Sequence, residues 1–281
     1  MTHGPVSRRW LLGATAACAA GLARPLRAQV RATLSVAVVP QFPAAVLHRD
    51  WTPLLDRLSR MVGADFRLLL QPSIPRFEAD VFAGTADLAY LNPYHQVIAR
   101  RERGYLPLVR SRVPLTGLLV VRQDDPITAL RGLDGKTLAF PAPNAFGASL
   151  WMRALLTERE KLQFTPTYVQ THGNVYRHVL SGQAAAGGGV NHTLSQERPE
   201  VRQGLRVLFE TPGVAPHPIS AHPRVDPGLR TAIAEALASL ATQPEGQALL
   251  QAVEIVDLVR ADHARDYAPL EAFQLDRYVV R

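Results

Sequence analysis

The chain has 281 residues, of which 47% are hydrophobic and 20% are charged, a composition typical of a folded globular protein. The formal net charge of +7 falls to +3, with 27 basic against 24 acidic residues, once the first 28 residues are set aside, because these hold four arginines and no acid. A charge this balanced, without a cluster of lysine and arginine among aromatic residues, excludes nucleic acid as the expected partner.

The first 28 residues have the pattern of an export signal. Arg8 and Arg9 precede an apolar run from Trp10 to Leu22, and small Ala28 suits a cleavage site. The arginine pair next to Trp and Leu favours the twin-arginine type, with a general secretory signal as the alternative. We therefore expect cleavage near Ala28 and a mature protein in the periplasm.

The only cysteine, Cys18, lies inside this leader. The mature chain would then have no disulfide, no thiolate nucleophile and no cysteine metal site. Lipidation of Cys18 stays open, although the residues before it, Thr15 to Ala17, lack the leucine typical of a lipobox.

Strands and helices are expected to alternate along the mature chain. Predicted strands are Leu34–Val39, Phe66–Leu70, Leu88–Leu91, Leu118–Val121, Thr137–Phe140, Tyr168–Gln170, Ala184–Val190 and Val207–Glu210. Predicted helices are Thr52–Val62, Phe77–Phe82, Tyr94–Arg103, Ala148–Leu156, Val175–Leu180, Gly228–Ala241 and Glu245–Val253. This alternation indicates an α/β fold with mainly parallel sheets.

Ligands of open α/β sheets bind where strands end and helices begin. Four such strand ends carry polar or aromatic groups: Pro40–Phe42, Tyr90–His95, Pro141–Ser149 and Thr171–Asn174. In the third, Asn144 and Gly147 suit a loop whose free backbone N–H groups face a ligand, and the helix dipole favours an anion there. These strand ends are the candidate binding site.

Each candidate also has a plain structural interpretation. Asn144 suits a helix cap, Tyr90 a packed strand residue, and Tyr94 either packing or the pocket. His172 precedes a helix, where a structural histidine is also common, and Phe146 suits an apolar wall better than a specific contact. The run Gly187–Gly189 indicates a strand end that something approaches closely.

Catalytic motifs are missing from the sequence, so we expect neither an enzyme nor a cofactor. No nucleophile elbow, phosphate-loop lysine or HExxH motif occurs. His172 and His178, like His217 and His222, lack the spacing of a helical ligand pair, so no metal site is expected. A metal would have to use Tyr90, Tyr94 and histidines from distant segments.

Three stretches together resemble the phosphate, phosphite and phosphonate binding proteins of ABC transporters, within the type II periplasmic-binding-protein superfamily. They are Ala86–Tyr94, Leu133–Phe140 with its proline-rich loop and Leu155–Leu156, and Thr171–His172 with Val179–Ala186. The resemblance runs from about Leu34 to Leu240 and depends on the order and spacing of all three.

The resemblance implies two α/β lobes, each a mainly parallel sheet flanked by helices, with a ligand cleft between them. Lobe 1 would comprise residues 29–117 and 218–281, and lobe 2 residues 118–217. The implied ligand-binding residues are Tyr90, Asn92, Tyr94, Asn144, Ala145, Phe146, Gly147, Ala148, Ser149, Thr171 and His172.

The chain departs from the relatives at two places in this site. A Ser-Thr-Ser run of the relatives is replaced by Ala145-Phe146-Gly147, and the aspartate that often follows the histidine is replaced by Gly173. The expected ligand is a small anion, of the phosphate, phosphite or phosphonate type or a related solute. Expected partners are an ABC transporter permease or, alternatively, a sensor histidine kinase, and a monomer is expected. An exported cofactor protein is the remaining alternative.

Overall fold

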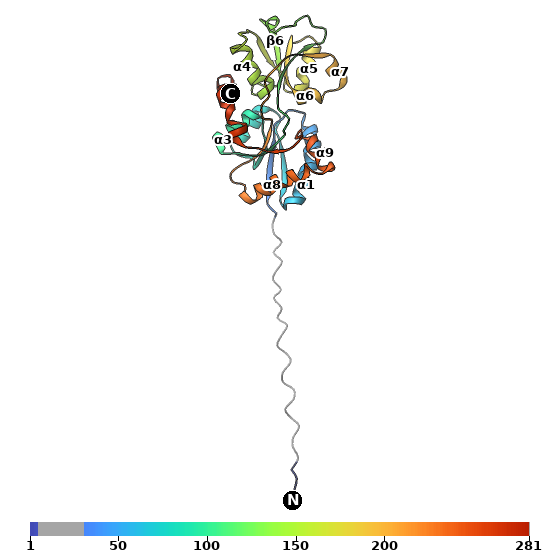
Figure 1. The fold of residues 1–281 in the computed structure, drawn as a ribbon, viewed down its shortest axis with the longest axis vertical. Coiled ribbons are helices and arrows are strands. Elements are labelled where there is room, and N and C mark those ends of the chain that lie inside the picture. Colours follow the sequence, from blue (N-terminus) through green and yellow to red (C-terminus); the bar gives the residue numbers. More distant parts are fainter. Residues whose placement is uncertain (5–30, 281) are drawn as a thin grey trace. The chain divides into compact units, whose positions relative to one another are not determined.

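The computed structural model describes residues 1–4 and 31–280, and residues 31–280 contain two α/β lobes, each built on its own sheet (Figure 1). The predicted leader, with Arg8, Arg9, Cys18 and Ala28, lies outside the described residues. No described helix combines the length and apolar character needed to cross a membrane.

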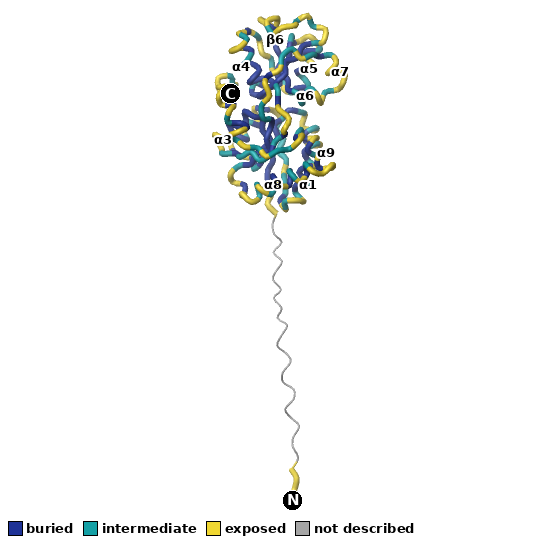
Figure 2. Tube along the Cα trace, in the orientation of Figure 1, coloured by how far each residue is buried: buried dark blue, intermediate teal, exposed yellow. Residues whose placement is uncertain are grey.

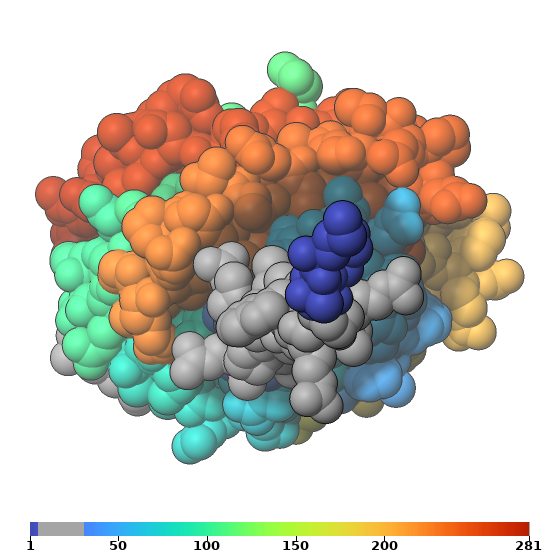
Figure 3. Space-filling view, turned by 90° about the horizontal axis from the view of Figure 1, so that it is seen from below, coloured from blue at the N-terminus to red at the C-terminus, as the bar shows by residue number. Residues whose placement is uncertain are grey.

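The first lobe is built on a six-stranded sheet with the order β11-β4-β10-β3-β1-β2. Its strands are β1 (Thr33–Val38), β2 (Asp65–Leu70), β3 (Leu88–Tyr90), β4 (Leu106–Arg110), β10 (Pro218–Ala221) and β11 (Val259–Arg260). Its helices are α1 (Ala44–Val62), α2 (Ile74–Phe82), α3 (Pro93–Arg103), α8 (Pro227–Leu240), α9 (Pro244–Ala252) and α10 (His263–Asp266). Seen from below in Figure 3, this surface combines early segments, blue to green, with late ones, orange to red.

The second lobe is built on a five-stranded sheet with the order β7-β6-β8-β5-β9. Its strands are β5 (Gly117–Arg122), β6 (Thr137–Phe140), β7 (Thr165–Tyr168), β8 (Ala186–Val190) and β9 (Leu205–Glu210). Its helical segments are a 3-10 turn (Leu130–Leu133), a π-helical turn (Phe146–Leu150) continued by α4 (Trp151–Glu158), α5 (His172–Leu180), α6 (Asn191–Ser195) and α7 (Pro199–Gln203).

Both sheets are mixed rather than mainly parallel. In the first lobe β1 pairs in parallel with β2 and β3, while β10 and β11 form antiparallel pairs. In the second lobe β6 pairs in parallel with β7 and β8, while β5 is antiparallel to β8 and β9. The chain enters the second lobe at the antiparallel strand β5 and returns to the first lobe at the antiparallel strand β10. The predicted two-lobed fold is confirmed.

Two predicted elements need correction, and three strands were not predicted. Helix α1 begins at Ala44, not at Thr52, because Leu47 and Trp51 extend the buried face of Leu54, and Pro53 lies inside the helix. Strand β7 is Thr165–Tyr168, about three residues earlier than predicted. The sequence reading missed β4, β10 and β11, which are short or contain proline and are defined by their pairing.

The core runs across both lobes (Figure 2). One buried cluster joins the first-lobe sheet to Phe146, Leu150, Trp151 and Val190 of the second lobe, and two smaller clusters cover the faces of the second sheet. The lobes are therefore packed against each other through apolar side chains.

The C-terminal segment, residues 268–280, contacts both lobes. It contains two 3-10 turns, Ala268–Phe273 and Leu275–Tyr278. Asp276 accepts a hydrogen bond from Tyr94 of α3, and Phe273 stacks on Trp151 of α4 with ring centroids 5.0 Å apart. Tyr278 donates to Glu158 at 2.6 Å.

Candidate functional site

A small pocket lies between the two lobes, and both lobes line it. Its apolar lining residues are Val39, Ile74, Leu115, Ala145, Phe146, Gly147, Ala148 and Val190. Its polar lining residues are Gln41, Asn92, His172 and His217. Among the described residues, no lysine or arginine lines it.

The first lobe supplies its polar groups from the ends of strands. Gln41 follows β1, and Asn92 follows β3, where it caps α3 by accepting a hydrogen bond from the His95 backbone at 2.7 Å. Asn92 also donates across the lobes to the Asn144 backbone oxygen at 3.4 Å. His217 directly precedes β10 and is 4% exposed. The carboxyl ends of β1 and β3 therefore face the second lobe, as the strand-end rule predicts.

The second lobe presents the beginning of a helix. Ser149 and Leu150 donate the first intrahelical bonds, to the Ala145 oxygen at 2.8 and 3.0 Å. The N–H groups of residues 146–148 precede these bonds and are the free donors of a helix start. A partial positive charge at this end favours an anionic or acceptor group of a ligand.

Two glycines let this helix start lie directly on the sheet. A Cβ on Gly117 would lie 2.3 Å from the Gly147 oxygen, and one on Gly188 would lie 1.9 Å from the Ala148 oxygen. Neither distance is possible for a real side chain. The glycine run of β8 therefore sets how closely the pocket wall approaches the sheet, in agreement with the close approach inferred from the sequence.

His172 lies at the first position of α5 and is 3% exposed. Its Nδ1 is 3.2 Å from Thr193 Oγ1, and Nε2 has no hydrogen-bond partner among the described residues. Burial, followed by the neighbouring His192, lowers the pKa of His172 to about 3, so its ring is neutral at physiological pH. His172 is therefore an uncharged hydrogen-bonding group of the pocket.

Other residues expected in the site lie next to the pocket rather than in its lining. Tyr90 is buried between Trp51 and His217, with ring centroids at 5.0 and 5.3 Å, and burial raises its pKa well above 10. Tyr94 bonds to Asp276 of the C-terminal segment, and burial raises its pKa. Tyr90 thus supports His217 from behind.

Ser149 and Thr171 also point their hydroxyl groups elsewhere. Ser149 Oγ accepts a hydrogen bond from Arg153 at 3.2 Å. Thr171 caps α5 by accepting from the Asn174 backbone at 3.2 Å. A direct role of either hydroxyl in binding stays a prediction.

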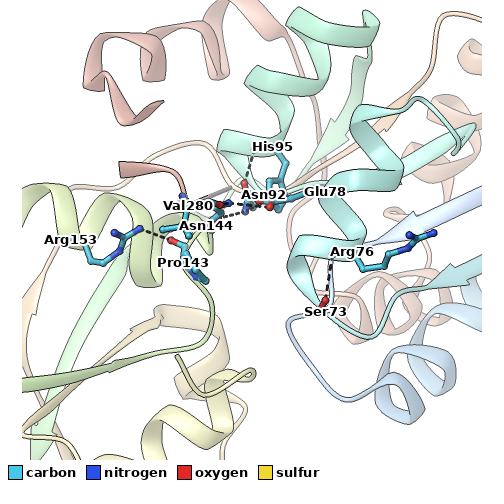
Figure 4. Close-up of polar contacts among 9 residues, drawn as sticks. All are labelled: Ser73, Arg76, Glu78, Asn92, His95, Pro143, Asn144, Arg153 and Val280. Atoms are coloured by element: carbon cyan, nitrogen blue, oxygen red, sulfur yellow. Dashed lines mark hydrogen bonds and ion pairs between the residues drawn. The ribbon is translucent and has the colours of Figure 1, made fainter. Parts of the chain in front are cut away.

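Asn144 joins the lobes beside the pocket instead of capping a helix (Figure 4). Its side chain donates to Glu78 Oε2 of α2 and to the Val280 oxygen, both at 3.0 Å, and accepts from the Val280 N–H at 3.1 Å. Glu78 in turn lies 2.9 Å from His95 Nε2. One asparagine thus connects the second lobe, the first lobe and the C-terminal segment.

A second connection lies on another side of the pocket. His192 of α6 is 2.8 Å from Glu254 Oε2 and 3.3 Å from Gln41 Nε2. Its ring packs at right angles against His217, with centroids 5.7 Å apart. This pair links the second lobe to the loop after α9.

Sequence reasoning missed His217 and did not include Gln41 in the site. Gln41 could have been found, because it stands at the carboxyl end of β1 in a stretch already marked as a strand end. His217 is adjacent to the predicted return to lobe 1 near Pro218, which was the available signal. Within residues 1–4 and 31–280, no group of three potential metal ligands comes together.

The two-lobed fold is shared by solved structures of binding proteins. The family model for the "ABC transporter, phosphonate, periplasmic substrate-binding protein" matches residues 36–267, so the chain belongs to this family. This confirms the family indicated by the sequence motifs. A search of curated protein sequences returns no match.

Solved structures share this fold at low sequence identity. A binding component of a Pseudomonas aeruginosa ABC phosphonate transporter is 12% identical, with a TM-score of 0.78 and coverage of 88% of both chains. A Prochlorococcus marinus protein in complex with methylphosphonate is 14% identical, with a TM-score of 0.79, covering 88% of this chain and 99% of that one. A Xanthomonas citri protein bound to chloride ion is 19% identical, with a TM-score of 0.71, covering 88% and 98%.

Proposed function

We propose that the chain is the exported solute-binding subunit of an ABC transporter, which captures a small anion between its lobes and delivers it to a permease. It acts by binding rather than by catalysis. The observation that carries this proposal is the shared pocket, in which Gln41, Asn92 and His217 of one lobe face His172 and the helix start at Phe146 of the other.

The pocket offers a chemical basis for binding an anion. The N–H groups of residues 146–148 are donors at a positive helix end, and neutral His172 adds one ring nitrogen. The structural neighbour in complex with methylphosphonate supports a small anion as the class of ligand. A sensor role would use the same site with a different partner, and no described feature favours it.

Binding is proposed to close the two lobes about crossings near Gly117 and Pro218. The change of sheet between β4 and β5, and again between β9 and β10, supports these lobe boundaries. The contacts of Asn144 with Glu78 and of His192 with Glu254 then belong to the closed form. Small-angle scattering should give a smaller radius of gyration with ligand than without it, and a monomer in both states.

A thermal-shift screen tests the proposed function directly. A solute that binds only the folded state raises the melting temperature. At a solute concentration one hundred times its Kd, it adds about 2.7 kcal/mol to the free energy of unfolding. The screen includes phosphate, phosphite, phosphonates, sulfonates, arsenite and small organic anions. Failure of every solute to shift the transition, or a tight ligand without lobe closure, would contradict the proposal.

Export is proposed to use the leader of residues 1–28. Mass spectrometry of periplasmic protein should find a mature chain beginning near Gln29. Replacing both Arg8 and Arg9 with lysine should block export by the twin-arginine route. Intact Met1 on cytoplasmic protein would contradict cleavage, and a diacylglycerol mass on Cys18 would indicate a lipid anchor.

A further inference from the structure

The polar lining of the pocket is uncharged at neutral pH. It consists of two amides, Gln41 and Asn92, and two imidazoles, His172 and His217. Burial lowers the pKa of His172 to about 3, and it lowers the pKa of His217 well below its ordinary value. The lining can therefore donate hydrogen bonds, but it carries no positive charge.

Two carboxylates of the first lobe flank this uncharged lining. Glu254 is paired with His192, which contacts Gln41, and its side chain is only 10% exposed. Its Oε1 has no hydrogen-bond partner among the described residues. Glu78 is paired with His95 and bonds to Asn144, next to the wall residue Ala145.

The flanking groups provide no excess of positive charge, because each carboxylate faces a single imidazole: Glu78 faces His95 and Glu254 faces His192. Arg153, on the helix that begins at the pocket, donates instead to the Pro143 oxygen at 2.8 Å (Figure 4). It also donates to the Tyr278 oxygen at 2.8 Å. No described cation is therefore placed to balance a doubly charged ligand.

The donors in the pocket match one negative charge. The partial charge at a helix start is about half of an elementary charge, and neutral hydrogen bonds add to it. A second charge would be buried without compensation, at a cost of several kcal/mol for a desolvated ion. The remaining wall is apolar, formed by Val39, Ile74, Leu115, Phe146 and Val190.

We infer that the ligand is a singly charged oxyanion with a small apolar substituent, such as a sulfonate or a singly protonated phosphonate, and not a dianion. The inference rests on the proposed function, because it assigns the charge of the solute that the same pocket captures. It also accounts for the Ala145-Phe146-Gly147 sequence at the helix start, which offers backbone donors and an apolar ring but no hydroxyl.

Three probes of nearly equal shape separate the charge states. Methylphosphonate is doubly charged above its second pKa, methanesulfonate is singly charged throughout, and dimethyl sulfone is uncharged. Calorimetry at about pH 8.5 should show methanesulfonate binding at least about tenfold more tightly than either of the others. Tighter binding of methylphosphonate at that pH, or equal binding of dimethyl sulfone, would overturn the inference.

The pH dependence gives an independent reading with the same protein. Methylphosphonate affinity should fall about tenfold per pH unit above its second pKa, because only the singly charged form binds, whereas methanesulfonate affinity should stay nearly constant. The methanesulfonate series is the control for titration of the protein itself. The titratable groups around the pocket are His95, His172, His192, His217, Glu78 and Glu254. Parallel curves for the two probes would contradict the inference.

A charge-only variant tests the acidic flank. Glu254→Gln should narrow the preference for methanesulfonate over methylphosphonate by about tenfold, since one flanking charge is removed. Glu245→Gln on α9, which does not line the pocket, is the matched control and should leave the preference unchanged. If the Glu254→Gln protein folds and its preference between the two probes is unchanged, the inference is contradicted. If this variant does not fold, the comparison of the three probes on the unaltered protein decides the inference.

Failure of the inference is distinguishable from failure of the proposed function. Binding of none of the three probes overturns the singly charged ligand class, while the wider thermal-shift screen and scattering still decide whether the lobes capture a solute. Preference for the dianion overturns the inference but supports solute capture.

Discussion

Replacing His172 with alanine separates its binding role from its structural role. The side chain is 3% exposed, bonds to Thr193 through Nδ1 at 3.2 Å and lines the pocket. Losing a hydrogen bond to a charged ligand costs about 1.5–3 kcal/mol, so affinity for methanesulfonate should fall roughly ten- to a hundredfold. Calorimetric titration of the two proteins measures this directly.

The structure also predicts a cost to stability. Thr193 keeps its partners Tyr176, at 2.8 Å, and Val190, so His172→Ala leaves no orphaned hydroxyl. The lost Nδ1 bond and the void from the buried ring should lower the free energy of unfolding by about 2 kcal/mol, measured by urea denaturation without ligand.

A second histidine of the same helix provides the control. His178 of α5 bonds to the Asn174 oxygen at 2.8 Å and does not line the pocket. His178→Ala should therefore lose about 1 kcal/mol of stability and no affinity. If His172→Ala loses stability but binds methanesulfonate as the unaltered protein does, His172 is purely structural and its assignment to the site is wrong.

Three further substitutions test other parts of the structure. Asp266→Asn should lower the free energy of unfolding by about 3 kcal/mol at pH 7 in urea denaturation, because it leaves half-buried Arg110 without its partner at 2.9 Å. Gly188→Ala should destabilise the second lobe by about 3 kcal/mol or more and weaken binding, because its Cβ would lie 1.9 Å from the Ala148 oxygen. Phe146→Thr should move preference toward methylphosphonate by adding a hydroxyl, as measured by calorimetry. It should also cost about 3 kcal/mol of stability in denaturation, because a buried ring that packs on Trp151 is lost.

Each of these substitutions has a discriminating control or a contradicting result. Burial opposes ionisation of Asp266, but hydrogen bonds from Arg265 and Arg110 outweigh it and hold its pKa well below the usual range. Its contribution is therefore present above about pH 5 and is lost as pH falls below about 4, so a pH-independent difference between Asp266→Asn and the unaltered protein contradicts it. Gly173→Ala is the control for Gly188→Ala. Its Cβ would meet only the ends of the Arg177 and Glu197 side chains, so this variant should fold normally. An unchanged ligand ranking in Phe146→Thr would show that this ring does not set selectivity.

The alternation of strands and helices was predictable because buried faces repeat locally. Leu54, Leu55 and Leu58 marked α1, although the same face already began at Leu47 and Trp51. Strand β10 was not predictable in this way, since its four residues begin with proline and become a strand by pairing with β3 and β4.

The candidate site was predictable where it depends on strand ends and helix starts. Asn92, Ala145–Ala148 and His172 line the pocket from such positions. Tyr94 could not be assigned from sequence, because its hydroxyl group bonds to Asp276, which follows it by 182 residues. His217 likewise enters the pocket only because of where the chain returns to the first lobe.

The C-terminal segment has a practical consequence for labelling the protein. Val280 bonds to Asn144, the neighbour of the pocket-lining Ala145, and Tyr278 is held by Arg153 and Glu158 of α4. A purification tag or fluorescent domain fused after this end would strain these contacts, which the proposed opening of the lobes would break. If the leader is removed as proposed, tags are therefore better placed at the new N-terminus, whereas a small dye attached at the C-terminus would report the proposed lobe opening.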